Sequence, residues 1–158
     1  IPISSIYSDR STLTFFFTES WLNATVSDAM LDPRGLYTSY RCDRIGRTGG
    51  GVAVFTHRSI HTKRVDLPSK YNLLECIILD FIRSGINLRM LLFYRPPCNN
   101  NPMMSQVCNC TEENVSCKFR AVALGDFNLN EINWLNSIVN GDGDQSFFFN
   151  TVSDLGFI

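Results

Sequence analysis

Three apolar segments of the sequence end in polar side chains that could act together on a phosphoryl group. Glu19 comes after TFFFT, Tyr94 after RMLLF, and Asp126 with Asn128 after AVAL. A strand end is rigid and its tip is exposed, so it holds a catalytic group in a fixed place. One carboxylate can bind a hard divalent cation, a second can activate water, and amide or phenol groups can donate hydrogen bonds to developing charge. The residue types therefore predict a single site, provided that these strand ends meet.

Each of these side chains also has a purely structural interpretation. Glu19 could cap the turn that follows it, and Asp126 with Asn128 could be turn residues whose side chains bond the backbone. Tyr94 could be a buried ring with a hydrated hydroxyl. Glu75, inside an apolar strand, is expected to be a paired or outward-facing carboxylate rather than a catalyst.

Two other catalytic designs are not supported by the sequence. Gly49–Gly51 lacks the Lys-Ser/Thr pair that would follow it in a phosphate-binding P-loop. No nucleophile elbow surrounds any serine, and the chain has only two histidines, so a serine or cysteine triad has no support.

The elements that must position these groups are short segments rich in β-branched and aromatic residues, separated by turns. We expect strands at residues 12–17, 36–42, 52–56, 74–82, 86–94 and 121–128, with a charged edge strand within 56–67. The Ser84-Gly85 turn predicts an antiparallel hairpin. Many strands with few helices predict stacked sheets.

Helices are expected at fewer places. Residues 22–31 predict a short helical or turn segment, 146–157 predict a helix, and 130–143 predict a loop. Residues 101–118 predict only a poor helix, capped by Asn101 with Pro102 at its first position, because Thr111 and Glu112 interrupt its apolar face.

Composition describes an ordinary globular domain. The chain has 158 residues, of which 44% are hydrophobic and 18% charged, and we expect one domain spanning 1–158. No unbroken apolar stretch is long enough to predict a membrane span. The net charge of −1 argues against a protein that mainly coats nucleic acid, but residues 41–64 carry six basic residues and one acid. That segment is either a solvated loop and strand edge or a surface that steers a polyanion.

The six cysteines leave two interpretations open. An even count with three glycosylation sequons is compatible with a secreted, disulfide-linked domain. Cys76 lies in an apolar run where a buried thiol is usual, and Cys98, Cys108, Cys110 and Cys117 lack the paired spacing of a zinc site. We favour reduced cysteines in an intracellular protein.

The order of the motifs adds a resemblance to a known family. The motifs, in order, are TESWL (18–22), YRCDR (40–44), RTGGGVAVF (47–55), LECIILDF (74–81), YRPP (94–97) and GDFN (125–128). This series resembles the endonuclease domain of jockey-like non-LTR retrotransposons, in the endonuclease/exonuclease/phosphatase superfamily that includes apurinic endonucleases. The resemblance covers nearly the whole chain, and the full set is far more specific than GDFN alone.

The resemblance implies an α+β fold, a four-layered α/β sandwich of two mostly antiparallel sheets flanked by helices. It also implies that the protein nicks target DNA with Mg²⁺ or Mn²⁺ and is in the nucleus when it acts. A reverse transcriptase would follow downstream in the same polyprotein, and no membrane partner is implied. Glu19 would be the metal ligand, Tyr94 would contact the scissile phosphate, Asp126 would orient and activate water, and Asn128 would assist at the phosphate. The arginines implied as DNA contacts are Arg41, Arg44, Arg47 and Arg95.

The sequence departs from the family at both ends. Ile1–Asp9 does not match the family's N-terminal asparagine motif, and Ser153-Asp154 is followed by Leu155 where the family has a histidine. We therefore expect a domain that is incomplete at both ends and weak or inactive alone. One alternative is a decayed, non-catalytic relic of a retroelement, either a folded binding module or a chain that does not pack properly. Another is a misassembled gene fragment.

Overall fold

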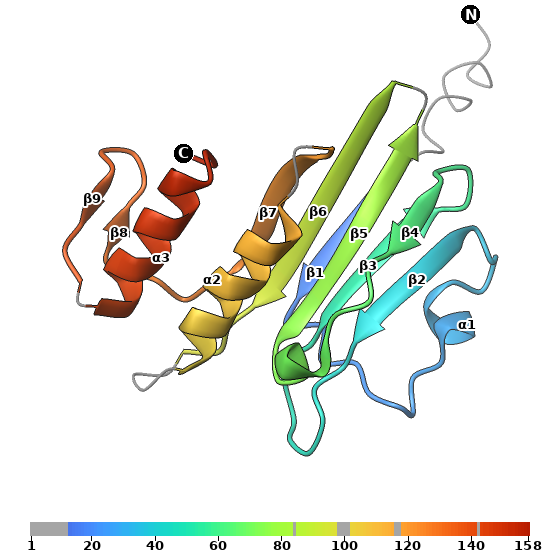
Figure 1. Cartoon of the computed structure of the whole chain (residues 1–158). Helices are drawn as coiled ribbons and strands as arrows, with labels where there is room; N and C mark the ends of the chain where they lie inside the picture. The colour runs from blue at the N-terminus through green and yellow to red at the C-terminus, as the bar shows by residue number, and fades with distance from the viewer. Residues whose placement is uncertain (1–12, 84, 98–101, 116–117, 142) are drawn as a thin grey trace, which may run out of the picture.

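The computed structural model describes residues 13–83, 85–97, 102–115, 118–141 and 143–158 (Figure 1). The strands in that part of the chain are β1 (Thr14–Thr18), β2 (Tyr37–Cys42), β3 (Val52–His57), β4 (Thr62–Arg64), β5 (Glu75–Arg83), β6 (Ile86–Tyr94), β7 (Arg120–Asp126), β8 (Ile132–Asn133) and β9 (Ile138–Val139). The helices are α1 (Asp28–Leu31), the 3₁₀ turn η2 (Ser69–Tyr71), α2 (Pro102–Asn114) and α3 (Gly143–Asp154). Ile1–Asp9, where the asparagine motif is missing, lies outside the described residues.

Two main sheets carry the architecture. The first is antiparallel, with the order β1-β3-β2. The second has the order β4-β5-β6-β7, and its β5–β6 hairpin is the one that the Ser84-Gly85 turn predicts. Strand β4 is at the edge, as its charge indicates. Strand β7 runs parallel to β6, because helix α2 forms the crossover between them.

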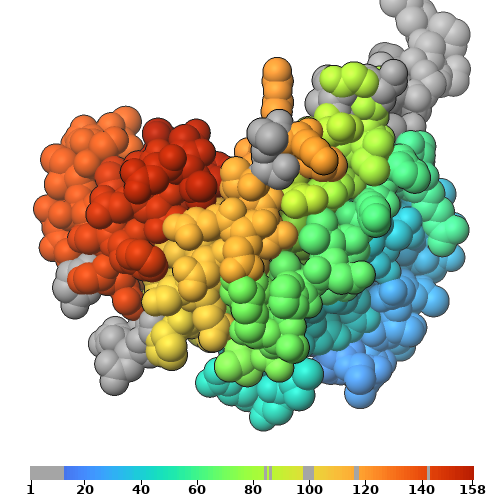
Figure 2. Space-filling view, viewed as in Figure 1, coloured from blue at the N-terminus to red at the C-terminus, as the bar shows by residue number. Residues whose placement is uncertain are grey.

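The core has two layers of side chains, one on each face of the second sheet. Apolar side chains from both sheets fill the first layer, between the sheets: Val52, Val54, Ile77, Leu79, Leu92 and Tyr94. Helices α2 and α3 cover the opposite face and bury a second cluster that includes Leu91, Phe93, Met104, Val107 and Phe148. Figure 2 shows α3 beside α2 on that face. The predicted α+β sandwich is confirmed, and in the described residues the helical layer outside the first sheet is only the one-turn helix α1.

Helix α2 is more regular than the sequence indicates. It begins at Pro102, as expected, and continues for 13 residues. The expectation that Thr111 interrupts the buried face was wrong, because Thr111 is itself buried and its hydroxyl donates to the carbonyl of Val107 at 2.8 Å. A threonine that bonds the preceding turn in this way leaves no unsatisfied polar group in the core.

The region between β7 and α3 also differs from the expected loop. Strands β8 and β9 form a two-residue antiparallel ribbon there, and α3 begins at Gly143, three residues earlier than predicted. Asn101, the predicted cap of α2, lies outside the described residues.

The inter-sheet face of β7 is incompletely covered. Val122 and Leu124 are the β7 partners of Met90 and Leu92, which are buried. Val122 is nevertheless 38% exposed and Leu124 36% exposed, because the first sheet ends at β1. The second edge of β7 pairs with no strand among the described residues.

No disulfide joins cysteines within the part of the chain that the structure describes. Cys42, Cys76, Cys108 and Cys110 are free thiols, as predicted, whereas Cys98 and Cys117 lie outside the described residues. None of the helices in the described residues has the length and apolar character that a membrane span needs.

Candidate active site

Glu19 and Tyr94 meet across the two sheets. The hydroxyl of Tyr94, at the end of β6, donates a hydrogen bond to the carboxylate of Glu19, just beyond the end of β1. Tyr94 is 4% exposed, while Glu19 is exposed. Burial, together with the Glu19 carboxylate, raises the pKa of Tyr94 to about 12. The phenol is therefore protonated at neutral pH and acts as a hydrogen-bond donor.

Asp126 lies beside this pair. It is the β7 partner of Tyr94 in the parallel ladder, so both residues stand at the same end of the sheet (Figure 1). Gly125 makes the close approach possible, because a Cβ atom there would lie 2.2 Å from the carbonyl oxygen of Phe93. The ends of β1, β6 and β7 thus converge, as the sequence predicts.

Asn128 is fixed by its neighbours in a turn. Its backbone N–H donates to Oδ1 of Asp126 at 3.1 Å, and its side-chain Nδ2 donates to the carbonyl of Arg95 at 2.7 Å. The turn-forming interpretation of Asp126 and Asn128 is therefore also correct. It does not exclude a catalytic role, since the second oxygen of Asp126 accepts no hydrogen bond from the described residues.

A largely buried ion pair lies against the ring of Tyr94. Nε of Arg44 donates to Oε1 of Glu75 at 2.5 Å, and the two side chains are 13% and 12% exposed. The Arg44 guanidinium carbon stands 5.5 Å from the centroid of the Tyr94 ring, at cation–π distance. Glu75 is the β5 partner of Tyr94. The expectation that Glu75 is a paired carboxylate is confirmed.

The Gly49–Gly51 turn ties this ion pair to the segment that carries Glu19. The N–H of Gly51 donates to Oε2 of Glu75. The carbonyls of Gly51 and Gly50 accept from the backbone N–H groups of Ser20 at 3.1 Å and Trp21 at 2.9 Å. Glu19 has a φ of 51°, a left-handed conformation that is costly for a residue with a side chain. The two hydrogen bonds after it help to hold that conformation.

The four arginines expected to contact DNA occupy different environments. Arg47 is exposed in the loop before the glycine turn. Arg41 is 15% exposed and pairs with Asp28 at 3.1 Å and Asp43 at 2.5 Å. Arg95 is 4% exposed and donates to the carbonyls of residues 127 and 128. Arg44 takes part in the ion pair described above. Of the four, Arg47 alone presents an exposed guanidinium.

A divalent cation fits this site in the way that Mg²⁺ usually binds. Within the described ranges, no three His, Cys, Asp or Glu side chains gather closely enough to hold a metal without help. Mg²⁺ commonly keeps several waters and takes only one or two carboxylates together with substrate phosphates. The exposed Glu19 carboxylate accepts a hydrogen bond from the Tyr94 phenol, whose strand partner is Asp126, so the site offers the one or two carboxylates that such binding needs.

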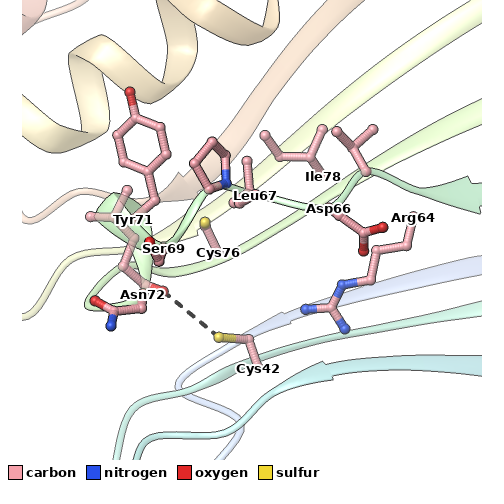
Figure 3. A pocket seen from close by; sticks show the side chains of 12 residues that line it. Cys42, Arg64, Asp66, Leu67, Ser69, Tyr71, Asn72, Cys76 and Ile78 are labelled. Carbon is pink, nitrogen blue, oxygen red and sulfur yellow. Dashed lines mark hydrogen bonds between the residues drawn. The ribbon is translucent and has the colours of Figure 1, made fainter.

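A separate hollow of about 350 Å³ is lined mainly by residues 64–74, which join β4 to β5, and is closed by residues of β2 and β5 (Figure 3). Its lining includes Cys42, Arg64, Tyr71 and Cys76 and none of the predicted catalytic residues. It is therefore distinct from the convergence of strand ends.

Sequence reasoning missed the roles of Glu75 and of the glycine turn in this site. The sequence predicts Glu75 as a paired or outward-facing carboxylate and Gly49–Gly51 as part of a family motif, but it names neither the partner of Glu75 nor the contact of the turn with Arg44. A usable signal was present, because two arginines and three glycines precede β3, and such a turn permits close packing that side chains would prevent.

The fold is that of the DNase I-like endonuclease domains. The chain is similar in structure to the endonuclease domain of TRAS1, a telomere-specific non-LTR retrotransposon, with a TM-score of 0.53 and 14% identity. The match covers 76% of this chain and 52% of that domain, so the chain spans about half the length of the TRAS1 domain.

A second solved structure with a lower score is D. rerio TDP2 complexed with a single-strand DNA product. It has a TM-score of 0.48 and 17% identity over 78% of this chain and 51% of that chain. No family model and no curated protein matches the sequence.

Proposed function

We propose that this chain is part of a metal-dependent DNA phosphodiesterase, the nicking endonuclease of a non-LTR retrotransposon. The observation that carries the proposal is the convergence of Glu19, Tyr94 and Asp126 at one end of two packed sheets. These residues are far apart in the sequence, and each is the motif residue to which the family resemblance gives a role. The TRAS1 fold supports the same architecture.

Each group has a distinct task in this proposal. A divalent cation, Mg²⁺ or Mn²⁺, held at Glu19 would neutralise charge on the phosphoryl oxygens. Asp126 accepts a proton from the attacking water through the oxygen that Asn128 does not use. Tyr94, protonated at neutral pH, donates to a non-bridging oxygen of the scissile phosphate. Because the Tyr94 hydroxyl bonds Glu19 in the structure, it exchanges this acceptor for the phosphate oxygen when the substrate binds.

DNA and a reverse transcriptase in the same polyprotein are the proposed partners. Arg47 is the arginine placed to contact the phosphate backbone, since its side chain is exposed near the glycine turn. Such a contact adds affinity and fixes the register on the duplex without reading sequence.

A plasmid-nicking assay tests the proposal. Supercoiled plasmid is incubated with Mg²⁺ or with EDTA, using this chain and a longer version of the protein that continues at both ends. We expect Mg²⁺-dependent open circles from the longer version and much slower nicking from this chain, which spans about half of the TRAS1 domain. Asp126→Ala should abolish nicking, and Asp66→Ala, at an exposed position away from the site, should not.

Three outcomes would contradict specific parts of the proposal. Nicking that survives Asp126→Ala in the longer protein would refute the assigned role of Asp126. Nicking that persists in EDTA would refute the metal. A longer version that folds and binds DNA, yet never nicks it, would favour the non-catalytic relic.

A further inference from the structure

We propose that Arg44 is a positioning residue of this active site. It lies between Glu75 and the Gly49–Gly51 turn and fixes the placement of the Tyr94 ring. The ring in turn fixes the position of the hydroxyl that bonds Glu19. This inference rests on the proposed function and assigns Arg44 a role other than contact with DNA. Four observations carry it.

The first is the burial of the ion pair. Arg44 and Glu75 are 13% and 12% exposed, and removing two charges from water costs free energy that a salt bridge recovers only with good geometry. Here both carboxylate oxygens of Glu75 are used, one by Nε of Arg44 and the other by the N–H of Gly51. The carboxylate of Glu75 is therefore fixed at both oxygens, and it holds the guanidinium of Arg44 through Nε.

The second is the position of the guanidinium against Tyr94. Its central carbon is 5.5 Å from the ring centroid, and Glu75 is the strand partner of Tyr94. The attraction between a cation and the face of an aromatic ring favours one placement of that ring. Because the hydroxyl of Tyr94 lies at the far tip of a rigid ring, a change in ring placement moves the hydroxyl relative to Glu19.

The third is the requirement for glycine at position 50. A Cβ atom on Gly50 would lie 2.3 Å from Cζ of Arg44, which is impossible without displacing the guanidinium. Gly50 also has a φ of 74°, which side chains disfavour. The turn thus provides the space that the Arg44 guanidinium occupies.

The fourth is that the same turn also holds the segment of Glu19, through backbone hydrogen bonds. The carbonyls of Gly50 and Gly51 accept from Trp21 and Ser20, immediately after Glu19. The turn therefore fixes one partner of the Tyr94–Glu19 bond through the backbone and the other through Arg44. A change at Arg44 should disturb one side of this bond and leave the other in place.

Fluorine NMR tests the positioning directly. The protein is labelled with 3-fluorotyrosine, and Tyr94→Phe identifies the Tyr94 resonance among those of the five tyrosines. Arg44→Lys keeps the charge but loses the planar fork, and Glu75→Gln removes the charge of its partner. Both variants should shift or broaden the Tyr94 resonance and leave the others unchanged. Arg83→Lys, at an exposed arginine at the opposite end of β5 from Glu75, is the control.

Nicking kinetics in the version of the protein that nicks plasmid give the second readout. Arg44→Lys and Glu75→Gln should lower kcat by roughly 10-fold to 100-fold, the usual effect of losing a residue that orients a catalytic group. KM for DNA should change little, whereas a residue that binds the DNA backbone would chiefly raise KM. Gly50→Ala should reproduce the Arg44 effect if the variant folds, and Arg44→Lys decides the matter if it does not.

The outcomes separate this inference from the proposed function. An unmoved Tyr94 resonance in both variants, or a raised KM with unchanged kcat, overturns the positioning role while nicking continues. A wild-type protein that does not nick refutes the proposed function, and the fluorine spectra still report whether Arg44 sets Tyr94. A shifted resonance with reduced kcat supports both.

Discussion

The hydroxyl of Tyr94 and the carboxylate of Glu19, 75 positions apart in the chain, share a hydrogen bond at the common end of two sheets. Tyr94→Phe removes this donor with little change in packing. We expect nicking to fall by about 100-fold, the order seen when one donor to developing charge is lost. The check is kcat at saturating Mg²⁺. Tyr40→Phe is the control, because the Tyr40 hydroxyl bonds Thr62 at 2.8 Å, away from the site, and its loss should leave the rate unchanged.

Removing one partner of a buried ion pair in the β5–β6 hairpin should destabilise the fold strongly. Asp80 is 7% exposed and accepts from Nε and Nη2 of Arg89 at 2.6 and 2.8 Å. Asp80→Asn leaves the guanidinium without its counter-charge, and we expect the free energy of unfolding to fall by about 2–4 kcal/mol. Urea unfolding followed by circular dichroism measures this. Glu113→Gln breaks the exposed pair with Lys70 and should leave the urea midpoint unchanged, so equal losses would contradict the prediction.

The docking of α1 on β2 should weaken in acid. Hydrogen bonds from Ser39 and Arg41 lower the pKa of Asp28. Because the carboxyl binds its proton less readily in the folded state, its contribution is complete above about pH 4 and is lost as the pH falls through the lowered pKa. The difference in urea midpoint between wild type and Asp28→Asn should therefore be constant near neutral pH and disappear in acid. A difference that grows as the pH falls would show the opposite linkage.

Thiol reactivity should follow position in the fold. Cys42 and Cys76 both line the hollow in Figure 3, but Cys42 is only half-buried, whereas Cys76, Cys108 and Cys110 are buried. Burial raises the pKa of Cys42, so it should react slowly with a thiol reagent at neutral pH. In a variant with serine at positions 98 and 117, we expect one thiol that reacts slowly in the native protein and three more that react only after unfolding. Fewer than four thiols in the unfolded variant would favour the disulfide-linked alternative.

The sequence predicted those features that depend on local pattern and motif order. The main strands follow from apolar runs bounded by turns, and the β5–β6 hairpin follows from the Ser84-Gly85 turn. That Glu19, Tyr94 and Asp126 share one site was implied by the resemblance of the motif order. Helix α2 was underestimated, because the pattern of apolar residues does not reveal that Thr111 can satisfy its hydroxyl within the helix.

The support behind the site could not be read from the chain. The distance between Arg44 and Glu75 depends on how β5 packs under the glycine turn, and a sequence shows no such approach. Charge alone suggested that Arg41 and Arg44 face a polyanion, yet the structure pairs each with carboxylates from other segments or its own loop. Counting basic residues therefore overstates the positive field available to DNA.

Strand β7 has a practical consequence for work with this chain. Within the described residues its second edge pairs with no strand, and Val122 and Leu124 beside that edge are over a third exposed. Such a strand is a template on which a neighbouring molecule can add its own strand, so loss of monomer should rise steeply with protein concentration. Kinetic and spectroscopic comparisons between variants then require dilute samples at matched concentration, with the monomer fraction measured in each.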